Sequence, residues 1–361
     1  MLFNLLTSLI DQYSFLNVFK YLTFRTGLSV VTSLVIVFLI GGPLIKIFSE
    51  NMITGPIRQD GPIDHIIKKS GTPTMGGVII IIGMLSSTLL WADLNNIYIW
   101  TLVFVSLSLG TLGFIDDLLK IKLKNSRGLN SKLKFLGQLI ISIIAILILA
   151  KFSEHEYLYN LYFPFFKNLI WHMGLFFIPF GLFVIIGSSN AVNLTDGLDG
   201  LATVPVMLVA LSFTLISYVV GNTIFSEYLK LQYIPDVGEL SIFCGSIVGS
   251  CLGFLWYNAP PAKIFMGDTG SLSLGGSLAA VAIIAKHEIV LAIIGGLFVL
   301  ETVSVIIQVI SFKLTGKRIF KMAPIHHHFE QKGWAESTIV IRFWIIAIIL
   351  ALVGLATLKL R

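Results

Sequence analysis

The sequence predicts an all-α polytopic integral membrane protein that forms a single transmembrane domain over residues 1–361. Two observations predict this class. Apolar residues make up 56% of the chain and charged residues only 12%, which is about half the charged share of a soluble globular protein. The apolar residues also gather into runs that approach the roughly 20 residues a membrane-spanning helix needs. Several runs are too long and too continuous for the alternating strands of a membrane barrel.

About ten transmembrane helices are expected. In chain order the apolar runs cover Thr26–Ile40, Val78–Leu90, Ile97–Ile115, Phe135–Ala150, Leu175–Gly187, Leu201–Val220, Leu240–Tyr257, Leu272–Ala285, Ile289–Phe312 and Ile339–Leu358. Gly41-Gly42-Pro43 and Pro205 are expected to break or kink their helices, which membrane helices tolerate. Met1–Phe19 lacks the basic start and the cleavage site of a signal peptide, so we expect a retained interfacial or partly inserted segment.

Ten spans place both chain ends on one side of the membrane, and five loops then face the other side. These loops cover residues 46–75, 116–134, 189–200, 258–270 and 313–342, and they hold 17 of the 25 Lys and Arg residues. By the positive-inside rule this side is cytoplasmic, so both termini are expected to be periplasmic. The net charge of +6 is therefore a surplus on one membrane face, and we expect no nucleic-acid partner.

Five carboxylates lie where cytoplasmic loops meet the apolar runs, at a depth where charge is costly and usually functional. They are Asp116, Asp117, Asp196, Asp199 and Asp268. On a helix the side chains of the adjacent residues 116 and 117 point about 100° apart. They are therefore suited to two different roles, such as a metal contact and a proton or phosphate contact. A solvated helix end is the alternative, but acids at a helix C-terminus oppose its dipole, which favours a functional interpretation.

Two further cytoplasmic loops carry chemistry-bearing residues. Residues 190–200 are rich in polar oxygens that suit a hard cation or a polar ligand, and an ordinary Asn/Asp/Gly turn explains them equally well. Residues 258–271 hold Asp268 and an aromatic residue able to stack on a base. The alternative interpretation is a tight turn, in which Gly and Pro residues are common. A tight turn explains Pro260 and Pro261, but it does not explain an acid beside an apolar span.

Basic and imidazole groups share this face. Three consecutive histidines at 326–328 cannot converge on one ion, and they make better sense as hydrogen-bond donors to oxyanions. Residues 68–77 bring two lysines and small residues near an anion, and residues 120–134 form a basic loop whose alternative role is lipid headgroup binding. Glu301 is the one acid well inside a span, and it is expected to face other helices or water. Together these groups indicate Mg²⁺-assisted phosphoryl transfer between a soluble donor and a lipid acceptor.

The whole chain resembles the polyprenyl-phosphate N-acetylhexosamine-1-phosphate transferases. Five motifs occur in the order of that family: Gly-Thr-Pro-Thr-Met-Gly-Gly at 71–77, Asp116-Asp117, Asn-Leu-Thr-Asp-Gly-Leu-Asp-Gly at 193–200, Phe-Met-Gly-Asp at 265–268 and Pro-Ile-His-His-His-Phe-Glu at 324–330. The His-His-His-Phe-Glu form points to the branch that uses UDP-MurNAc-pentapeptide over the branch that uses UDP-N-acetylglucosamine.

The resemblance implies a Mg²⁺-dependent enzyme that transfers phospho-MurNAc-pentapeptide from UDP-MurNAc-pentapeptide to undecaprenyl phosphate, giving lipid I and UMP. It implies a multi-pass protein of the bacterial inner membrane, among membrane lipids, with its active site facing the cytoplasm. Whether the chain acts alone or as a homodimer stays open.

The resemblance also assigns site residues. Asp268 corresponds to the principal Mg²⁺ ligand, with Asp116 and Asp117 beside it, and His326 and His327 join these three as catalytic residues. The uridine pocket corresponds to Lys69, Asp196 and Phe265, with the Phe265 ring stacked on uracil. The full set of substrate-binding residues that it implies is Lys69, Thr74, Lys120, Lys132, Asn190, Asn193, Asp196, Asp199, Asn258, Phe265 and His328.

Two mechanisms and two other classes stay open at this stage. Either an aspartate attacks the donor to form a phospho-enzyme, or the lipid phosphate attacks directly with Asp116 as base. The direct route is favoured because a phosphate monoester has a second pKa near 6 and is largely dianionic at pH 7. The Asn-x-x-Asp-x-x-Asp pattern at Asn193–Asp199 faintly resembles a motif of intramembrane prenyltransferases, but that class gives the three histidines no role. A transporter would place its charge at the bilayer midplane, not at one face.

Overall fold

The computed structural model describes residues 1–54, 71–123, 128–152, 155–166 and 169–360. Within this part of the chain, nine helices are long and apolar enough to cross a membrane. They are α2 (Leu22–Glu50), α5 (Ile97–Leu123), α6 (Ser131–Phe152), α8 (Phe177–Thr195), α9 (Thr203–Val220), α11 (Leu240–Asn258), α12 (Gly267–Ile284), α14 (Gly296–Thr315) and α16 (Glu336–Leu360). The shorter apolar helix α4 (Gly77–Trp91) joins them, so the prediction of an all-α polytopic membrane protein is confirmed.

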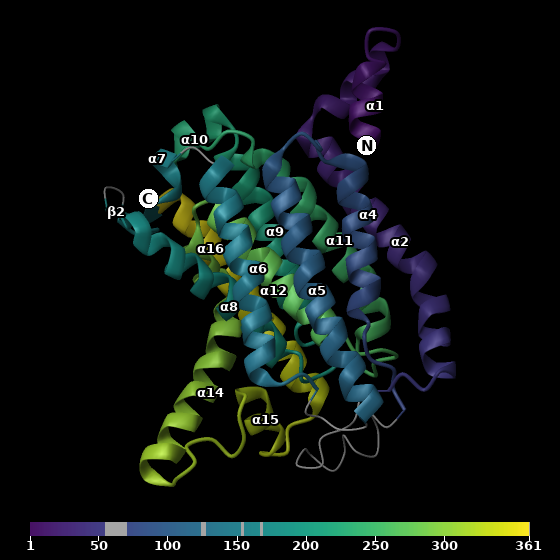
Figure 1. The fold of residues 1–361 in the computed structure, drawn as a ribbon, viewed down its shortest axis with the longest axis vertical. Helices are drawn as coiled ribbons and strands as arrows, with labels where there is room; N and C mark the ends of the chain where they lie inside the picture. Colours follow the sequence, from purple (N-terminus) through teal and green to yellow (C-terminus); the bar gives the residue numbers. More distant parts are fainter. Residues whose placement is uncertain (55–70, 124–127, 153–154, 167–168, 361) are drawn as a thin grey trace.

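The remaining elements are short. They are α1 (Leu2–Ser8), η1 (Ser14–Lys20), α7 (His155–Leu158), β1 (Asn160–Tyr162), β2 (Ile170–His172), η2 (Gly174–Phe176), α10 (Thr223–Leu229), η3 (Val237–Glu239), α13 (Glu288–Ile294) and α15 (Ile325–Glu330). The two strands pair antiparallel, with Leu161 opposite Trp171. Both chain ends lie in the upper half of Figure 1, whereas α15 and the C-terminal end of α5 lie at the bottom. That the termini are periplasmic stays a prediction.

The structure refines three details of the predicted spans. The apolar run Ile289–Phe312 is divided at Gly295 into α13 and α14. Helix α2 continues through Pro43 to Glu50, which excludes a break at this proline, and a kink there stays a prediction. Pro205 does not break α9 either, because it lies in the first turn, where backbone N–H groups have no partner within the helix.

The centre of the bundle is formed by α11 and α12 (Figure 1). Helix α11 packs on α2 and α9, and α12 packs on α5 and α8. A Cβ at Gly77 would lie 2.0 Å from the backbone nitrogen of Gly270, so only glycine permits this contact between α4 and α12. This packing places the N-terminus of the buried helix α12 beside the C-terminal ends of α5 and α8.

The Gly-Thr-Pro-Thr-Met-Gly-Gly segment lies along the loop that enters α12. Phe265 N donates to Pro73 O at 2.9 Å, Gly76 N donates to Phe265 O at 2.8 Å, and Gly77 N donates to Met266 O at 2.8 Å. These backbone hydrogen bonds bring two motifs that are about 190 residues apart in the sequence to the same end of the bundle.

Candidate active site

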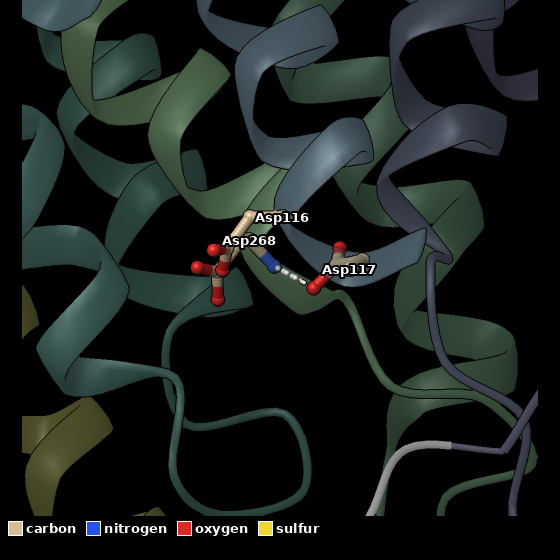
Figure 2. A group of neighbouring side chains, drawn as sticks. All are labelled: Asp116, Asp117 and Asp268. Atoms are coloured by element: carbon tan, nitrogen blue, oxygen red, sulfur yellow. Dashed lines mark hydrogen bonds between the residues drawn. The ribbon is translucent and has the colours of Figure 1, made fainter. Parts of the chain in front are cut away.

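Three aspartates meet where α5 ends and α12 begins (Figure 2). Asp116 and Asp117 lie in the last turns of α5, and Asp268 is the second residue of α12. One carboxylate oxygen from each lies within 4.8 Å of the others. The first two are buried and Asp268 is half-buried. The predicted convergence of these three carboxylates is therefore present in the structure.

Asp117 caps the N-terminus of α12. Its Oδ1 accepts a hydrogen bond from Asp268 N at 3.2 Å, drawn as a dashed line in Figure 2. Its Oδ2 accepts from Thr269 N at 3.0 Å and from the Thr269 hydroxyl at 2.8 Å. A carboxylate at this position satisfies free backbone donors and interacts favourably with the helix dipole. Asp117 thereby fixes the position of Asp268 relative to α5.

Two lysine ammonium groups lie between the other two carboxylates. Lys120 Nζ is 2.6 Å from Asp116 Oδ2 and 3.0 Å from Asp268 Oδ2. Lys134 Nζ is 2.5 Å from Asp268 Oδ2 and 3.7 Å from Asp116 Oδ2. The other oxygen of Asp116 accepts a hydrogen bond from Leu129 N at 2.6 Å. Buried carboxylates in such numbers require cations, and here the lysines supply them.

Helix α8 adds amide groups to the site. Asn193 Nδ2 donates to Asp268 Oδ1 at 2.9 Å and to Ser271 Oγ at 2.8 Å. One turn earlier, Asn190 Nδ2 donates to Gln138 Oε1 at 3.0 Å. Asn190 and Asn193, two of the three asparagines predicted as substrate-binding, thus belong to one polar face that connects α8 to α12 and α6.

Lys134, which sequence reasoning missed, lies in the cluster, whereas Lys132 is exposed at the start of α6. The difference follows from helical register. Lys134, Gln138 and Ser142 are four residues apart and form a polar stripe on an otherwise apolar helix, and the last two are buried. That stripe was the sequence signal that could have distinguished the two lysines.

Asp199 and Asn258 form hydrogen bonds with the loop between α11 and α12. Asp199 Oδ2 accepts a hydrogen bond from Ala262 N at 2.9 Å. Asn258 Oδ1 accepts from Thr203 Oγ1 at 2.8 Å, and its Nδ2 donates to Ile264 O at 2.9 Å. Both side chains are buried. Through these contacts the two residues stabilise the loop that precedes Asp268.

The remaining uridine-pocket candidates lie around this loop. Phe265 is half-buried, and Thr74 is buried beside it on the paired segment. Asp196 is the half-buried C-cap residue of α8. Lys69 lies outside the described residues. The structure therefore brings two of the three uridine-pocket candidates, Asp196 and Phe265, together with Thr74 to the end of the bundle that carries the aspartates.

The three histidines have three different environments, as expected from their consecutive positions. His326 is fully buried and its Nδ1 lies 3.1 Å from Glu301 Oε1. His327 Nδ1 lies 2.5 Å from Glu330 Oε2.

His328 Nδ1 accepts a hydrogen bond from Lys321 N at 3.1 Å. Burial, with the nearby ammonium groups of Lys332 and Lys321, lowers the pKa of His328 below its ordinary value of 6.5. A neutral imidazole is what this hydrogen bond requires, because Nδ1 acts as the acceptor.

An apolar groove of about 300 Å³ opens between α8, α12, α13 and α14. Its wall includes Ala191 and Val192 of α8, which directly precede Asn193, and Leu278 of α12. Its other lining residues include Phe298 and Ile306 of α14. The apolar groove is thus lined by the same two helices, α8 and α12, that carry Asn193 and Asp268.

Comparison with known proteins identifies the class first. Residues 99–286 match the family model described as Glycosyl transferase family 4, and this region holds all three aspartates and both lysines of the cluster. The fold and site are therefore those of a membrane-embedded transferase of this family.

The particular family follows from closer matches. Residues 69–81 match the phospho-N-acetylmuramoyl-pentapeptide-transferase signature 1. Phospho-N-acetylmuramoyl-pentapeptide-transferases of Pelagibacter ubique (strain HTCC1062), Rickettsia prowazekii (strain Madrid E) and Maricaulis maris (strain MCS10) are 69%, 58% and 53% identical to this chain, each over 100% of both chains. The chain belongs to the phospho-N-acetylmuramoyl-pentapeptide-transferase family.

Proposed function

We propose that this chain transfers phospho-MurNAc-pentapeptide from UDP-MurNAc-pentapeptide to undecaprenyl phosphate, which gives lipid I and UMP. One observation carries the proposal. Three carboxylates and two lysine ammonium groups form a single cluster at one end of a helical membrane bundle, and α12, which carries one of these carboxylates, also lines an apolar groove. We place this end at the cytoplasmic face of a bacterial inner membrane and both termini in the periplasm, because the Lys and Arg surplus lies on the loops of that face.

The groove supports a lipid acceptor. Its lining is dominated by aliphatic and aromatic side chains, and it includes residues of α8 and α12, the helices that carry Asn193 and Asp268. We propose that an isoprenoid chain lies in this groove with its terminal phosphate directed toward Lys120 and Lys134. Ammonium groups form short, charge-assisted hydrogen bonds with phosphate oxygens, so these lysines suit that end of the acceptor.

The donor set fits a divalent cation. Carboxylate oxygens are the ligands of hard cations such as Mg²⁺, and Asp116, Asp117 and Asp268 offer one oxygen each within a small volume. When bound there, Mg²⁺ would neutralise the charge that develops on a diphosphate during phosphoryl transfer. The nearby lysines already balance part of the carboxylate charge and hold the three side chains in place.

The contacts of the aspartates favour direct attack by the lipid phosphate over a phospho-enzyme. Both oxygens of Asp117 accept hydrogen bonds from the start of α12, and both oxygens of Asp116 are engaged by Leu129 N and Lys120. A carboxylate with both oxygens so engaged is a weak nucleophile. The acceptor phosphate is mostly dianionic at pH 7, so Asp116 needs to orient it more than to remove a proton.

The donor is proposed to lie over the loops that surround the cluster. Phe265 would stack on uracil, and Asp196, Thr74 and Lys69 would hydrogen-bond the uridine. His327 and His328 face the sugar and phosphates in this arrangement. Imidazole N–H groups are suitable donors to oxyanions, and they provide direction without adding a fixed charge at neutral pH.

The test compares two donors. Purified protein with Mg²⁺ and undecaprenyl phosphate should release UMP from UDP-MurNAc-pentapeptide and not from UDP-N-acetylglucosamine. UMP from the second donor alone would contradict the proposed substrate and favour the other branch. A quench with donor alone should leave no phosphoryl label on the protein, because the direct route needs both substrates together.

A further inference from the structure

Glu301 of α14 and His326 of α15 form a buried pair apart from the aspartate cluster. Both side chains have no exposed surface, and His326 Nδ1 lies 3.1 Å from Glu301 Oε1. Among the described residues, neither carboxylate oxygen of Glu301 and neither imidazole nitrogen of His326 makes a hydrogen bond. The close approach of Nδ1 to Oε1 is therefore the one polar contact found there for either side chain.

Stability alone does not account for such a pair. Removing two ionisable side chains from water costs free energy, and apolar residues of similar volume often stabilise a buried site as well or better. What a carboxylate adds is direction, because an acceptor at one ring nitrogen fixes the tautomer and the rotation of an imidazole. The pair is suited to holding the His326 ring in one orientation.

The opposite edge of the ring lies against the turn that follows α8. A Cβ at Gly197 would lie 2.3 Å from His326 Nε2, so the ring reaches the backbone of this turn only because residue 197 is glycine. Gly197 follows Asp196, and Asn193 three residues earlier contacts Asp268. The imidazole thus connects α14 with the turn that follows α8, the helix whose Asn193 donates to Asp268.

The same ring also packs against the ring of the next histidine. The His326 and His327 ring centroids are 4.2 Å apart. Helix α15 has only six residues, so few contacts of its own hold it in place. Rotation of His326 would move His327 and the whole of α15 relative to the turn at Gly197.

We propose that Glu301 is a positioning residue, which orients His326 and thereby holds α15, with His327, against the donor side of the active site. This inference rests on the proposed function for its substrate. It also assigns His326 to positioning instead of contact with the reacting phosphates, because the ring is fully enclosed between α14 and the turn after α8.

Steady-state kinetics of Glu301→Gln, His326→Gln and the double variant test the pair. Loss of this buried contact between a carboxylate and an imidazole should lower kcat/KM for UDP-MurNAc-pentapeptide by about 10- to 100-fold in each single variant. The double variant should lose no more than the worse single variant, because the two residues act as one unit. KM for undecaprenyl phosphate should stay within about twofold, since the acceptor groove is not altered.

Glu239→Gln is the matched control. Glu239 forms an ion pair with buried Arg25 at 2.6 Å, away from the active site, so its loss should lower Tm without changing the donor KM. Equal Tm losses in Glu301→Gln and Glu239→Gln with an unchanged donor KM in both would overturn the positioning role. Additive losses in the double variant would overturn it as well.

A second measurement does not depend on turnover. Hydrogen–deuterium exchange of residues 321–331 should be faster in Glu301→Gln than in the wild type, and unchanged in Glu239→Gln. Unchanged exchange in Glu301→Gln refutes the pair even if the wild type proves inactive with UDP-MurNAc-pentapeptide. Faster exchange with an inactive wild type refutes the proposed substrate and leaves the pair supported.

Discussion

Replacing Lys134 with Met should reduce turnover strongly, whereas the same change at Lys132 should not. Lys134 Nζ lies 2.5 Å from Asp268 Oδ2, and its side chain is 18% exposed. Lys132 is exposed and its side chain makes no ion pair within the described residues. The two lysines are two residues apart on α6, so the pair of variants separates a specific contact from the general positive charge of this loop.

The magnitude follows from the contact. At an effective dielectric constant of about 20, unit charges 2.5 Å apart interact by about 7 kcal/mol before desolvation is subtracted. Lys120 remains 3.0 Å from the same carboxylate oxygen, so the variant does not leave Asp268 without a cation. A hydrogen bond to a charged group has a net value of about 1.5–3 kcal/mol, which corresponds to a loss of about 10- to 150-fold in kcat/KM.

The assay is UMP release by purified protein at saturating Mg²⁺, with Tm measured on each variant to confirm folding. Lys132→Met should stay within about twofold of the wild type, as an exposed substitution does. Equal activity of the two variants, whether both high or both low, would refute the assignment of Lys134 to the site.

Three further predictions address the metal ligands, the packing and the pH dependence. Asp268→Asn should abolish UMP release at any Mg²⁺ concentration, and near-normal turnover at limiting Mg²⁺ would remove it as a metal ligand. Gly77→Ala should cost about 1–3 kcal/mol of stability or more, because its Cβ would lie 2.0 Å from Gly270 N, whereas Gly42→Ala meets nothing within 4 Å and should leave Tm unchanged or slightly raised. His328 has a lowered pKa in the folded protein, so stability present above pH 6.5 should decline as the pH falls below that value. His328→Asn should flatten the dependence of Tm on pH in that range, and an unchanged slope would contradict this reasoning.

The membrane spans could be predicted because long apolar runs rarely form anything other than membrane-spanning helices. Nine of the ten predicted runs correspond to one helix each. The exception, Ile289–Phe312, is apolar throughout, so hydropathy carries no sign of the division at Gly295. The sequence could not decide between a break and a kink at Pro43, because the outcome depends on how neighbouring helices satisfy the freed backbone group, and the structure excludes only the break.

The aspartate cluster could be predicted because charge at the end of an apolar run is rarely accidental. The choice between Lys132 and Lys134 depended on where α6 begins, and boundaries are the least certain part of a sequence interpretation. The pairing of Glu301 with His326 could not be predicted at all. The two residues belong to different helices, and no local pattern links an acid within a span to an imidazole beyond it.

The fate of the phosphate next to the donor sugar tests the central claim most directly. UDP-MurNAc-pentapeptide with radiolabelled phosphorus at that position is incubated with the purified protein, Mg²⁺ and undecaprenyl phosphate, and the lipid fraction is extracted. We expect the label in the lipid product only when undecaprenyl phosphate is present, and none in the lipid with Asp268→Asn. Label that stays in water-soluble products while UMP is released would contradict phosphosugar transfer to the lipid acceptor.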